Sequence, residues 1–167
     1  MEQSPLVFTG TEQAITAADI QTLEQEYNLR LPDDYKAHLL AHNGGWPQNR
    51  TDFIQVDEAS KSRITRAISD FYSVKYGTTT LEDALEDLYD QLHPDLIPFG
   101  AEAGGDQFCL SVGPQDYGSI YYISHEFYTP PKRREKKLPR HYGTGVSLLA
   151  PSFTAFLNGL VDSSLIL

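Results

Sequence analysis

Residues 96–124 read LIPFGAEAGGDQFCLSVGPQDYGSIYYIS, and this stretch decides the fold. It contains three short apolar or aromatic runs, at 96–102, 107–112 and 119–124, which are separated by turns rich in Gly, Asp and Pro. Strands joined by such short turns pair antiparallel, because a parallel pair needs a crossover of roughly a dozen residues or more. The stretch therefore predicts an antiparallel meander.

Helical patterns flank this meander on both sides. Apolar residues recur at helical spacing in four segments, at 16–27, 31–43, 80–92 and from 150 onward. Thr16 begins the first of them with a capping-box pattern, in which its hydroxyl accepts from an amide three residues later. Helices, then strands, then a helix predict an α+β fold with a curved, mainly antiparallel sheet and helices packed on one side.

Three further segments complete the expected organisation. Residues 52–57 (DFIQVD) suit a short strand, whereas 61–76 fit a helix by spacing and a strand by composition, so both stay open. Residues 127–143 are basic, contain prolines and end in glycine, which predicts an exposed loop or hairpin tip. The sequence has no repeat or long linker, and we expect 1–167 to form a single domain.

The chain is acidic. It has 167 residues, with 23 Asp and Glu against 13 Lys and Arg, for a net charge of −10. Residues 132–140 (KRREKKLPR) hold six of the basic residues, which leaves 7 basic and 22 acidic residues elsewhere. Because binding to a phosphate backbone relies on clustered Lys and Arg, we expect no nucleic-acid partner. The basic segment is expected to meet either an acidic partner or the protein's own acidic body.

The composition is that of a folded protein in a reducing compartment. Hydrophobic residues make up 40% of the chain and charged residues 22%, which suits a packed core. No run approaches the roughly 20 apolar residues of a membrane span, and the first ten residues do not resemble a secretory signal. We therefore expect a cytoplasmic protein with no membrane contact. The lone Cys109 lies in an apolar strand pattern, which predicts a buried, inert thiol.

Patterns for catalysis or metal binding are weak. His38 and His42 stand four apart on one predicted helix, a spacing that can present two imidazoles to a metal. No third ligand can be placed, so we interpret them as two histidines on a solvated face. No G-x-S-x-G sequence occurs, and residues 104–106 (GGD) lack the lysine of a P-loop, which favours a tight turn between strands. We expect no catalytic residue, metal or cofactor.

Three segments occur in an order that is typical of one group of proteins. They are 20–45, with LPDDYK and NGG; 96–122, with LIPFG and GGDQFCL; and 148–157, which reads LLAPSFTAFL. Their order resembles the SUKH superfamily, which unites fungal cell-wall assembly regulators, the bacterial Syd protein and many bacterial toxin-immunity proteins. The likeness covers about 15–160, the expected core of the domain. The sequence departs from the simplest pattern in an insertion-like stretch at 58–92 and in the strongly basic loop at 129–142.

The resemblance implies a protein-binding module that is not an enzyme. Its implied role is that of an immunity protein, which neutralises a polymorphic toxin by occluding it. The acidic charge favours a basic toxin domain, as in nuclease toxins, because charge complementarity speeds association. The alternative role is that of an intracellular regulatory scaffold of the cell-wall regulator type. The identity of the partner and the oligomeric state stay open.

Seven residues are candidate partner contacts. The acids at 82–90 form either the solvated face of an amphipathic helix or a landing surface for a basic domain. A loop tryptophan is either a plug of the core or an interface anchor. The resemblance places the 104–106 turn near the rim of a cleft formed by the curved sheet. The candidates are Trp46, Glu86, Asp90, Glu102, Asp106, Tyr117 and Tyr121.

Overall fold

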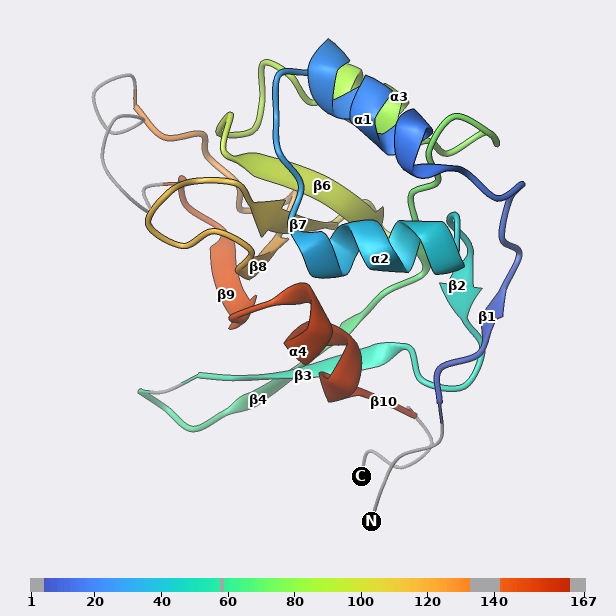
Figure 1. The fold of residues 1–167 in the computed structure, drawn as a ribbon. Helices are drawn as coiled ribbons and strands as arrows, with labels where there is room; N and C mark the ends of the chain where they lie inside the picture. The colour runs from blue at the N-terminus through green and yellow to red at the C-terminus, as the bar shows by residue number, and fades with distance from the viewer. Residues whose placement is uncertain (1–4, 58, 133–141, 163–167) are drawn as a thin grey trace.

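The computed structural model describes residues 5–57, 59–132 and 142–162. Its elements, labelled in Figure 1 where there is room, follow in the order β1 (Phe8–Thr9), α1 (Ala17–Glu26), α2 (Asp33–Ala41), β2 (Trp46–Pro47), β3 (Asp52–Val56), β4 (Arg63–Ala67), β5 (Asp70–Phe71), α3 (Leu81–Asp87), β6 (Leu96–Ala101), β7 (Gln107–Ser111), β8 (Ile120–Ile123), β9 (Val146–Ala150), α4 (Phe153–Gly159) and β10 (Leu160–Val161). The predicted meander is present as β6, β7 and β8.

The named strands all pair antiparallel. The largest sheet has the order β5-β6-β7-β8-β9, and two smaller sheets have the orders β10-β3-β4 and β1-β2. The register shifts between Pro98 and Gly100 and between Ile120 and Tyr121. Such bulges bend a strand and increase its twist, which curves the large sheet. The predicted α+β fold with a curved, mainly antiparallel sheet is confirmed.

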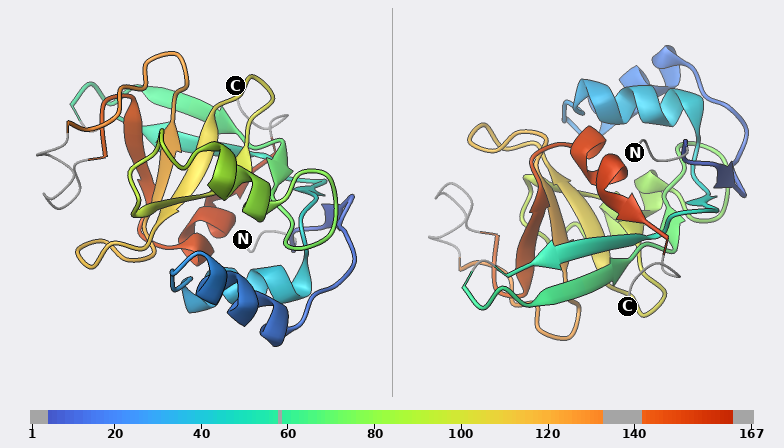
Figure 2. Two further views of the ribbon diagram at one scale, coloured as in Figure 1. Left: turned by 90° about the horizontal axis from the view of Figure 1, so that it is seen from above. Right: turned by 90° about the horizontal axis from the view of Figure 1, so that it is seen from below.

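Two hydrophobic clusters lie on opposite faces of the central strands, because successive side chains of a strand alternate in direction. Phe99, Phe108 and Tyr122 belong to the larger cluster, together with residues from all four helices. Cys109 and Tyr121 belong to the smaller one. The four helices thus share one core with one face of the sheet, as predicted, and Figure 2 shows α2 and α4 side by side there.

The helices begin where the sequence indicates. The hydroxyl of Thr16 accepts from the amide of Asp19 (3.2 Å), and the Asp19 carboxylate accepts from the amide of Thr16 (3.0 Å). Pro32 precedes α2, and Ser152 caps α4 through the amide of Ala155 (3.0 Å). These contacts supply partners for amides that have none within the helix.

The third helix is shorter than the predicted 80–92. α3 ends at Asp87, and the chain continues in turns, in which the amide of Leu92 donates to the carbonyl of Leu88 (3.1 Å). Leu81 packs in the larger cluster, whereas Leu88 and Leu92 pack in the smaller one. One straight helix would place them all along a single stripe. The chain therefore leaves the helix as it passes from one cluster to the other.

Residues 61–76, for which the sequence left two possibilities open, contain strands. β4 pairs with β3 along its whole length, from Val56↔Arg63 to Asp52↔Ala67. The next strand, β5, joins the edge of the large sheet. For this segment, the composition rich in strand formers predicted the structure better than the helical spacing did, because its residues pair with strands of two sheets. Figure 1 shows the β3–β4 hairpin extending to one side, below α4.

The predicted loop at 127–143 is only partly described, since 133–141 lie outside the described residues. Phe127 at its start is exposed, and Thr129 pairs with Thr144 at its base. Tyr142 is buried in the smaller cluster, so the end of the segment is anchored in the protein. No helix in the described residues has the length and apolar character needed to cross a membrane.

Candidate functional site

An open groove of about 620 Å³ lies where the end of α1 and the α3 region approach the start of β6. Residues 26–30 form one side, which we name the α1 wall. The other side, the α3 wall, comes from residues between 85 and 95. The floor consists of 96–98 together with Val112 and Tyr117. The groove therefore draws on parts of the chain that are far apart in sequence.

The α1 wall is held in a fixed turn. Asn28 adopts a left-handed conformation (φ 51°), which asparagine tolerates better than most residues, and the chain reverses there after α1. The carboxylate of Glu24 accepts from the amide of Leu31 (2.8 Å) and lies 3.8 Å from the ammonium of Lys36. These contacts tie the wall to the helices on either side of it.

The two helices behind the walls are joined at both of their ends. At their C-terminal ends, the hydroxyl of Tyr27 donates to the carboxylate of Glu86 (2.9 Å). At their N-terminal ends, the ammonium of Lys75 pairs with Asp19 (3.1 Å), while its backbone amide donates to Glu82 (2.7 Å). α1 and α3 are therefore fixed relative to each other before any partner arrives.

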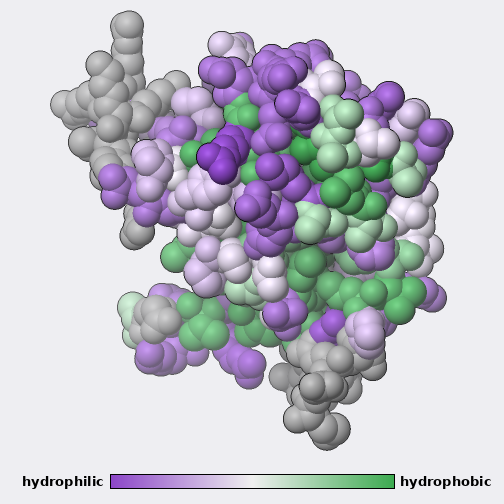
Figure 3. All heavy atoms as spheres, viewed as in Figure 1, coloured by the Kyte–Doolittle hydropathy of each residue, from purple (hydrophilic) through white to green (hydrophobic). Residues whose placement is uncertain are grey.

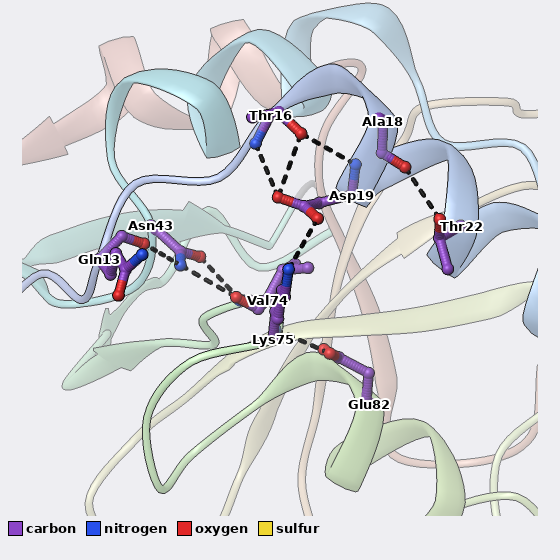
Figure 4. Close-up of polar contacts among 9 residues, drawn as sticks. All are labelled: Gln13, Thr16, Ala18, Asp19, Thr22, Asn43, Val74, Lys75 and Glu82. Atoms are coloured by element: carbon purple, nitrogen blue, oxygen red, sulfur yellow. Dashed lines mark hydrogen bonds and ion pairs between the residues drawn. The ribbon is translucent and has the colours of Figure 1, made fainter.

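Figure 4 shows how the N-terminal junction is built. The amide side chain of Asn43 accepts from the backbone of Val74 (2.7 Å) and donates to the carbonyls of Val74 (3.0 Å) and Gln13 (2.8 Å). The Asp19 carboxylate accepts from Thr16 and pairs with the neighbouring lysine, and these contacts lower its pKa. Of this network, only the contact between Thr16 and Asp19 could be predicted from the sequence.

The floor is fastened to both walls. The hydroxyl of Tyr117 donates to the carbonyl of Arg30 in the α1 wall (2.7 Å). The amide of Val112 donates to the carbonyl of Asp95 in the α3 wall (2.8 Å). A groove held in this way loses little conformational entropy when a partner binds.

The groove has an apolar lining, and the segment that supplies its α3 wall is acidic. Leu29, Leu85, Leu88 and Val112 remain partly exposed within it, and Tyr89 on the α3 wall is 81% exposed. The segment 82–95 contains no Lys or Arg, and its six acidic residues are Glu82, Asp83, Glu86, Asp87, Asp90 and Asp95. In Figure 3, hydrophilic side chains likewise dominate the upper part of the molecule, over α1.

Three of the seven predicted contacts lie at or beside this groove. Tyr117 is 44% exposed and forms part of its floor. Glu86 supports the α3 wall through its contact with Tyr27, and Asp90 is exposed in the turn that follows α3. Their gathering on one side of the molecule depends on the fold, because Tyr117 is far from the other two in sequence.

Glu102 and Asp106 lie at the opposite end of β6, in the tight turn that the GGD sequence predicts. Glu102 accepts from the amide of Gly104. Asp106 accepts from the hydroxyl of Tyr122, from the backbone amide of His125 (2.9 Å) and from the ring of the same histidine. Burial opposes the ionised form of Asp106, but these hydrogen bonds outweigh it and lower its pKa. Both acids therefore have a structural role in this turn.

Two predicted aromatic contacts differ from each other. Trp46 lies in β2 and is 40% exposed, with its ring so close to Gly10 that a side chain there would collide with it. It borders a separate, smaller hollow and not the groove. Tyr121 is only 7% exposed, and its hydroxyl donates to the buried Asp116. It faces inward from the central sheet, so we remove it from the candidate contacts.

The expectation of a solvated face for the two helical histidines is wrong. His38 is buried, and its ring packs edge-on against Phe8 and Phe153, while His42 stacks on Phe8. Burial and the neighbouring His42 lower the pKa of His38 to about 3. The strand β1 covers this face of α2, which the sequence does not reveal because β1 has only two residues. No group of three or more metal-ligating side chains occurs among the described residues.

Cys109 is buried, as predicted, and burial raises the pKa of its thiol. A thiol of this kind is a poor nucleophile, because the reactive form is the thiolate. The groove residues Tyr27, Leu29 and Tyr89 were not among the candidates predicted from the sequence. Their one signal is that Tyr89 falls outside the apolar stripe of the 80–92 segment.

The fold and groove define a class of protein: an open antiparallel α+β fold with a preorganised, partly apolar groove beside an acidic segment. The profile of the SMI1 / KNR4 family (SUKH-1) matches residues 14–159, and the chain belongs to this family. The family is generally non-catalytic and includes toxin-immunity and regulatory proteins. The chain is also similar to the SPbeta prophage-derived uncharacterized protein YokK of Bacillus subtilis (strain 168). The two are 26% identical over 159 residues, which cover 88% of this chain and 75% of the relative.

Proposed function

We propose that this protein is an immunity protein, which binds a toxin domain through the groove and blocks it. The observation that carries this proposal is the fixed groove, with partly exposed leucines between two tied walls and an acidic segment along one of them. Membership of a family that includes toxin-immunity proteins supports it.

The protein acts by binding and not by catalysis. The family is generally non-catalytic, and the cysteine is buried with a raised pKa. Binding is sufficient for immunity, because a partner that covers a toxin's active site excludes the substrate. The toxin meets its inhibitor in the cytoplasm of the protected cell.

Charge selects the partner and speeds its arrival. The net charge of −10 attracts a domain of opposite charge, and electrostatic steering raises association rates by factors of roughly 10 to 1,000. Nuclease domains carry basic surfaces because they bind phosphate backbones. The proposed partner is therefore a basic toxin domain, with nucleases as the first candidates.

The test is co-expression with the toxin-like C-terminal domains encoded beside this gene. An inactive variant of each domain serves as bait for a pull-down, and the active form serves in a growth-rescue assay. We expect a complex that weakens with added salt, and growth restored by this protein but not by an unrelated acidic protein of similar size. Absence of both complex and rescue would reject the immunity role and turn the search to a regulatory partner among the cell's own proteins.

A further inference from the structure

We propose that the groove binds one amphipathic α-helix of the toxin domain, with Lys or Arg on the side of that helix that faces the α3 wall. This inference rests on the proposed function and specifies how the partner is recognised. Three features of the groove support it: the burial of its floor, the charge of its α3 wall and the exposure of its tyrosines.

The floor favours a helix over an extended peptide. An extended peptide gains affinity by adding its backbone to an open strand edge. The floor residues Leu96, Ile97 and Pro98 are all buried, and each of them pairs with β7. Because these three residues are buried, the groove offers little strand backbone to which an extended peptide could add. A helix already satisfies its own backbone hydrogen bonds and can occupy such a surface with apolar side chains spaced three and four residues apart.

The charges orient the helix. The α3 wall carries Asp95 and no Lys or Arg, and the exposed Asp87 and Asp90 belong to the same segment, beside the lining residues. The facing α1 wall is mixed, since it carries one acidic and one basic residue. Basic residues of the occupant consequently gain more on the α3 side. That preference fixes which side of the bound helix faces which wall.

Two tyrosines provide the anchoring contacts. Tyr89 is 81% exposed on the α3 wall, and Tyr117 is 44% exposed in the floor. Tyrosine is enriched among the few residues that carry most of the binding energy of an interface. Both positions are held before binding: the Tyr117 hydroxyl donates to the carbonyl of Arg30 (2.7 Å), and the amide of Tyr89 donates to the carbonyl of Glu86 (3.4 Å).

Matched variants of the full chain test the inference against the toxin found by co-expression. Tyr89→Ala and the double variant Asp87→Lys/Asp90→Lys should each weaken the complex by about tenfold or more. The controls are Phe127→Ala, which also removes an exposed aromatic ring, and Asp70→Lys/Glu126→Lys, which changes the net charge equally at exposed positions outside the acidic segment 82–95. The controls should stay within about twofold of the original affinity.

A second arm separates failure of this inference from failure of the proposed function. The probe is a synthetic helical peptide of about 18 residues with leucines on one face and lysines beside them, compared with the same peptide carrying glutamates. The lysine peptide should shift the amide NMR signals of residues 85–95, and Tyr89→Ala should abolish the shifts. Toxin binding that is insensitive to the groove variants would overturn the inference and leave the immunity role intact.

Three other results would also overturn it. Groove signals that stay unchanged with the lysine peptide, or that shift equally with the glutamate peptide, would reject a basic helix whether or not a toxin is found. A change in the mass of the free protein on Tyr89→Ala, measured by sedimentation, would show that a second copy of this chain fills the groove instead.

Discussion

The hydroxyl of Tyr27 donates to the carboxylate of Glu86 across 2.9 Å and so joins the end of α1 to the last turn of α3. The two residues are 59 positions apart in the chain. Burial, then the hydrogen bond and negative charge of Glu86, raise the pKa of the Tyr27 phenol, so the hydroxyl remains a donor throughout the physiological range. The geometry of the groove depends on this contact, since each partner belongs to a different wall.

Tyr27→Phe should loosen the groove with a small loss of stability. Because the Glu86 carboxylate is exposed to solvent, removing this hydrogen bond should cost only about 0.5–1.5 kcal/mol, which urea unfolding can measure. The toxin complex should weaken as well, because the walls are then less preorganised. For stability alone, Tyr89→Phe is the control, since its side chain is largely exposed. A Tyr27→Phe protein with unchanged stability and unchanged affinity would show that the walls do not need this contact.

The fold could be predicted from the sequence where local signals and tertiary packing agree. The Thr16 capping box, the proline before α2 and the apolar or aromatic runs within 96–124 all appear as predicted. The prediction failed where packing overruled periodicity. Leu88 and Leu92 fit a helical repeat, but they pack beneath the sheet's other face, so the chain bends after Asp87.

The groove could be predicted only in part. In the sequence, the acids at 82–90 are recognised by their charge, and Tyr117 is recognised as an aromatic residue in a predicted turn. Their proximity to residues 26–30 cannot be predicted in the same way, because it depends on long-range pairs such as Tyr27–Glu86, which leave no local sequence pattern. Tyr121 was misjudged for a related reason. Along β8 all four residues are buried, so the strand lacks the polar alternation that tells an inner face from an outer one.

A second prediction concerns the stability that the buried carboxylate of Asp116 confers. Asp116 accepts hydrogen bonds from Ser111 (2.6 Å), from Tyr142 (2.8 Å) and from Tyr121. Tyr142→Phe removes a donor to a buried charged group and should lower the free energy of unfolding by about 1.5–3 kcal/mol. Thermal or urea unfolding measures the loss.

Tyr35→Phe is the matched control for that experiment. The Tyr35 hydroxyl is buried, and it has no hydrogen-bond partner among the residues that the structure describes. Its removal should leave stability unchanged or raise it, because an unsatisfied buried hydroxyl is lost. Equal losses in the two variants would contradict the hydrogen-bond account and point to ring packing alone.

His125 should titrate above its ordinary range. Its ring contacts the Asp106 carboxylate, and this hydrogen bond raises the pKa of His125. NMR titration should give a midpoint above about 6.5, and Asp106→Asn should bring it down toward that value. Glu126→Gln, which removes a more weakly coupled carboxylate, should move it less.

The same pair has a defined pH window for stability. The contribution of His125 is complete below its unfolded pKa and is lost as the pH rises through its higher folded pKa. That of Asp106, whose folded pKa is lowered, is complete above its unfolded pKa and is lost in acid. Asp106→Asn should therefore cost most between about pH 4.5 and 6. A cost that does not vary with pH would mean that the two groups are not coupled.

His38 should make the protein less stable in mild acid. In the folded state its pKa is about 3, so below about pH 6.5 the unfolded chain binds a proton that the folded protein does not. Stability then falls by about 1.4 kcal/mol per pH unit, or about 2 kcal/mol between pH 6.5 and 5. Urea unfolding of the original protein, His38→Phe and His38→Leu at several pH values isolates this contribution. The variants retain His42, His125 and every carboxylate, so the difference in slope belongs to position 38. Parallel curves for all three proteins would show that His38 is protonated in the folded state.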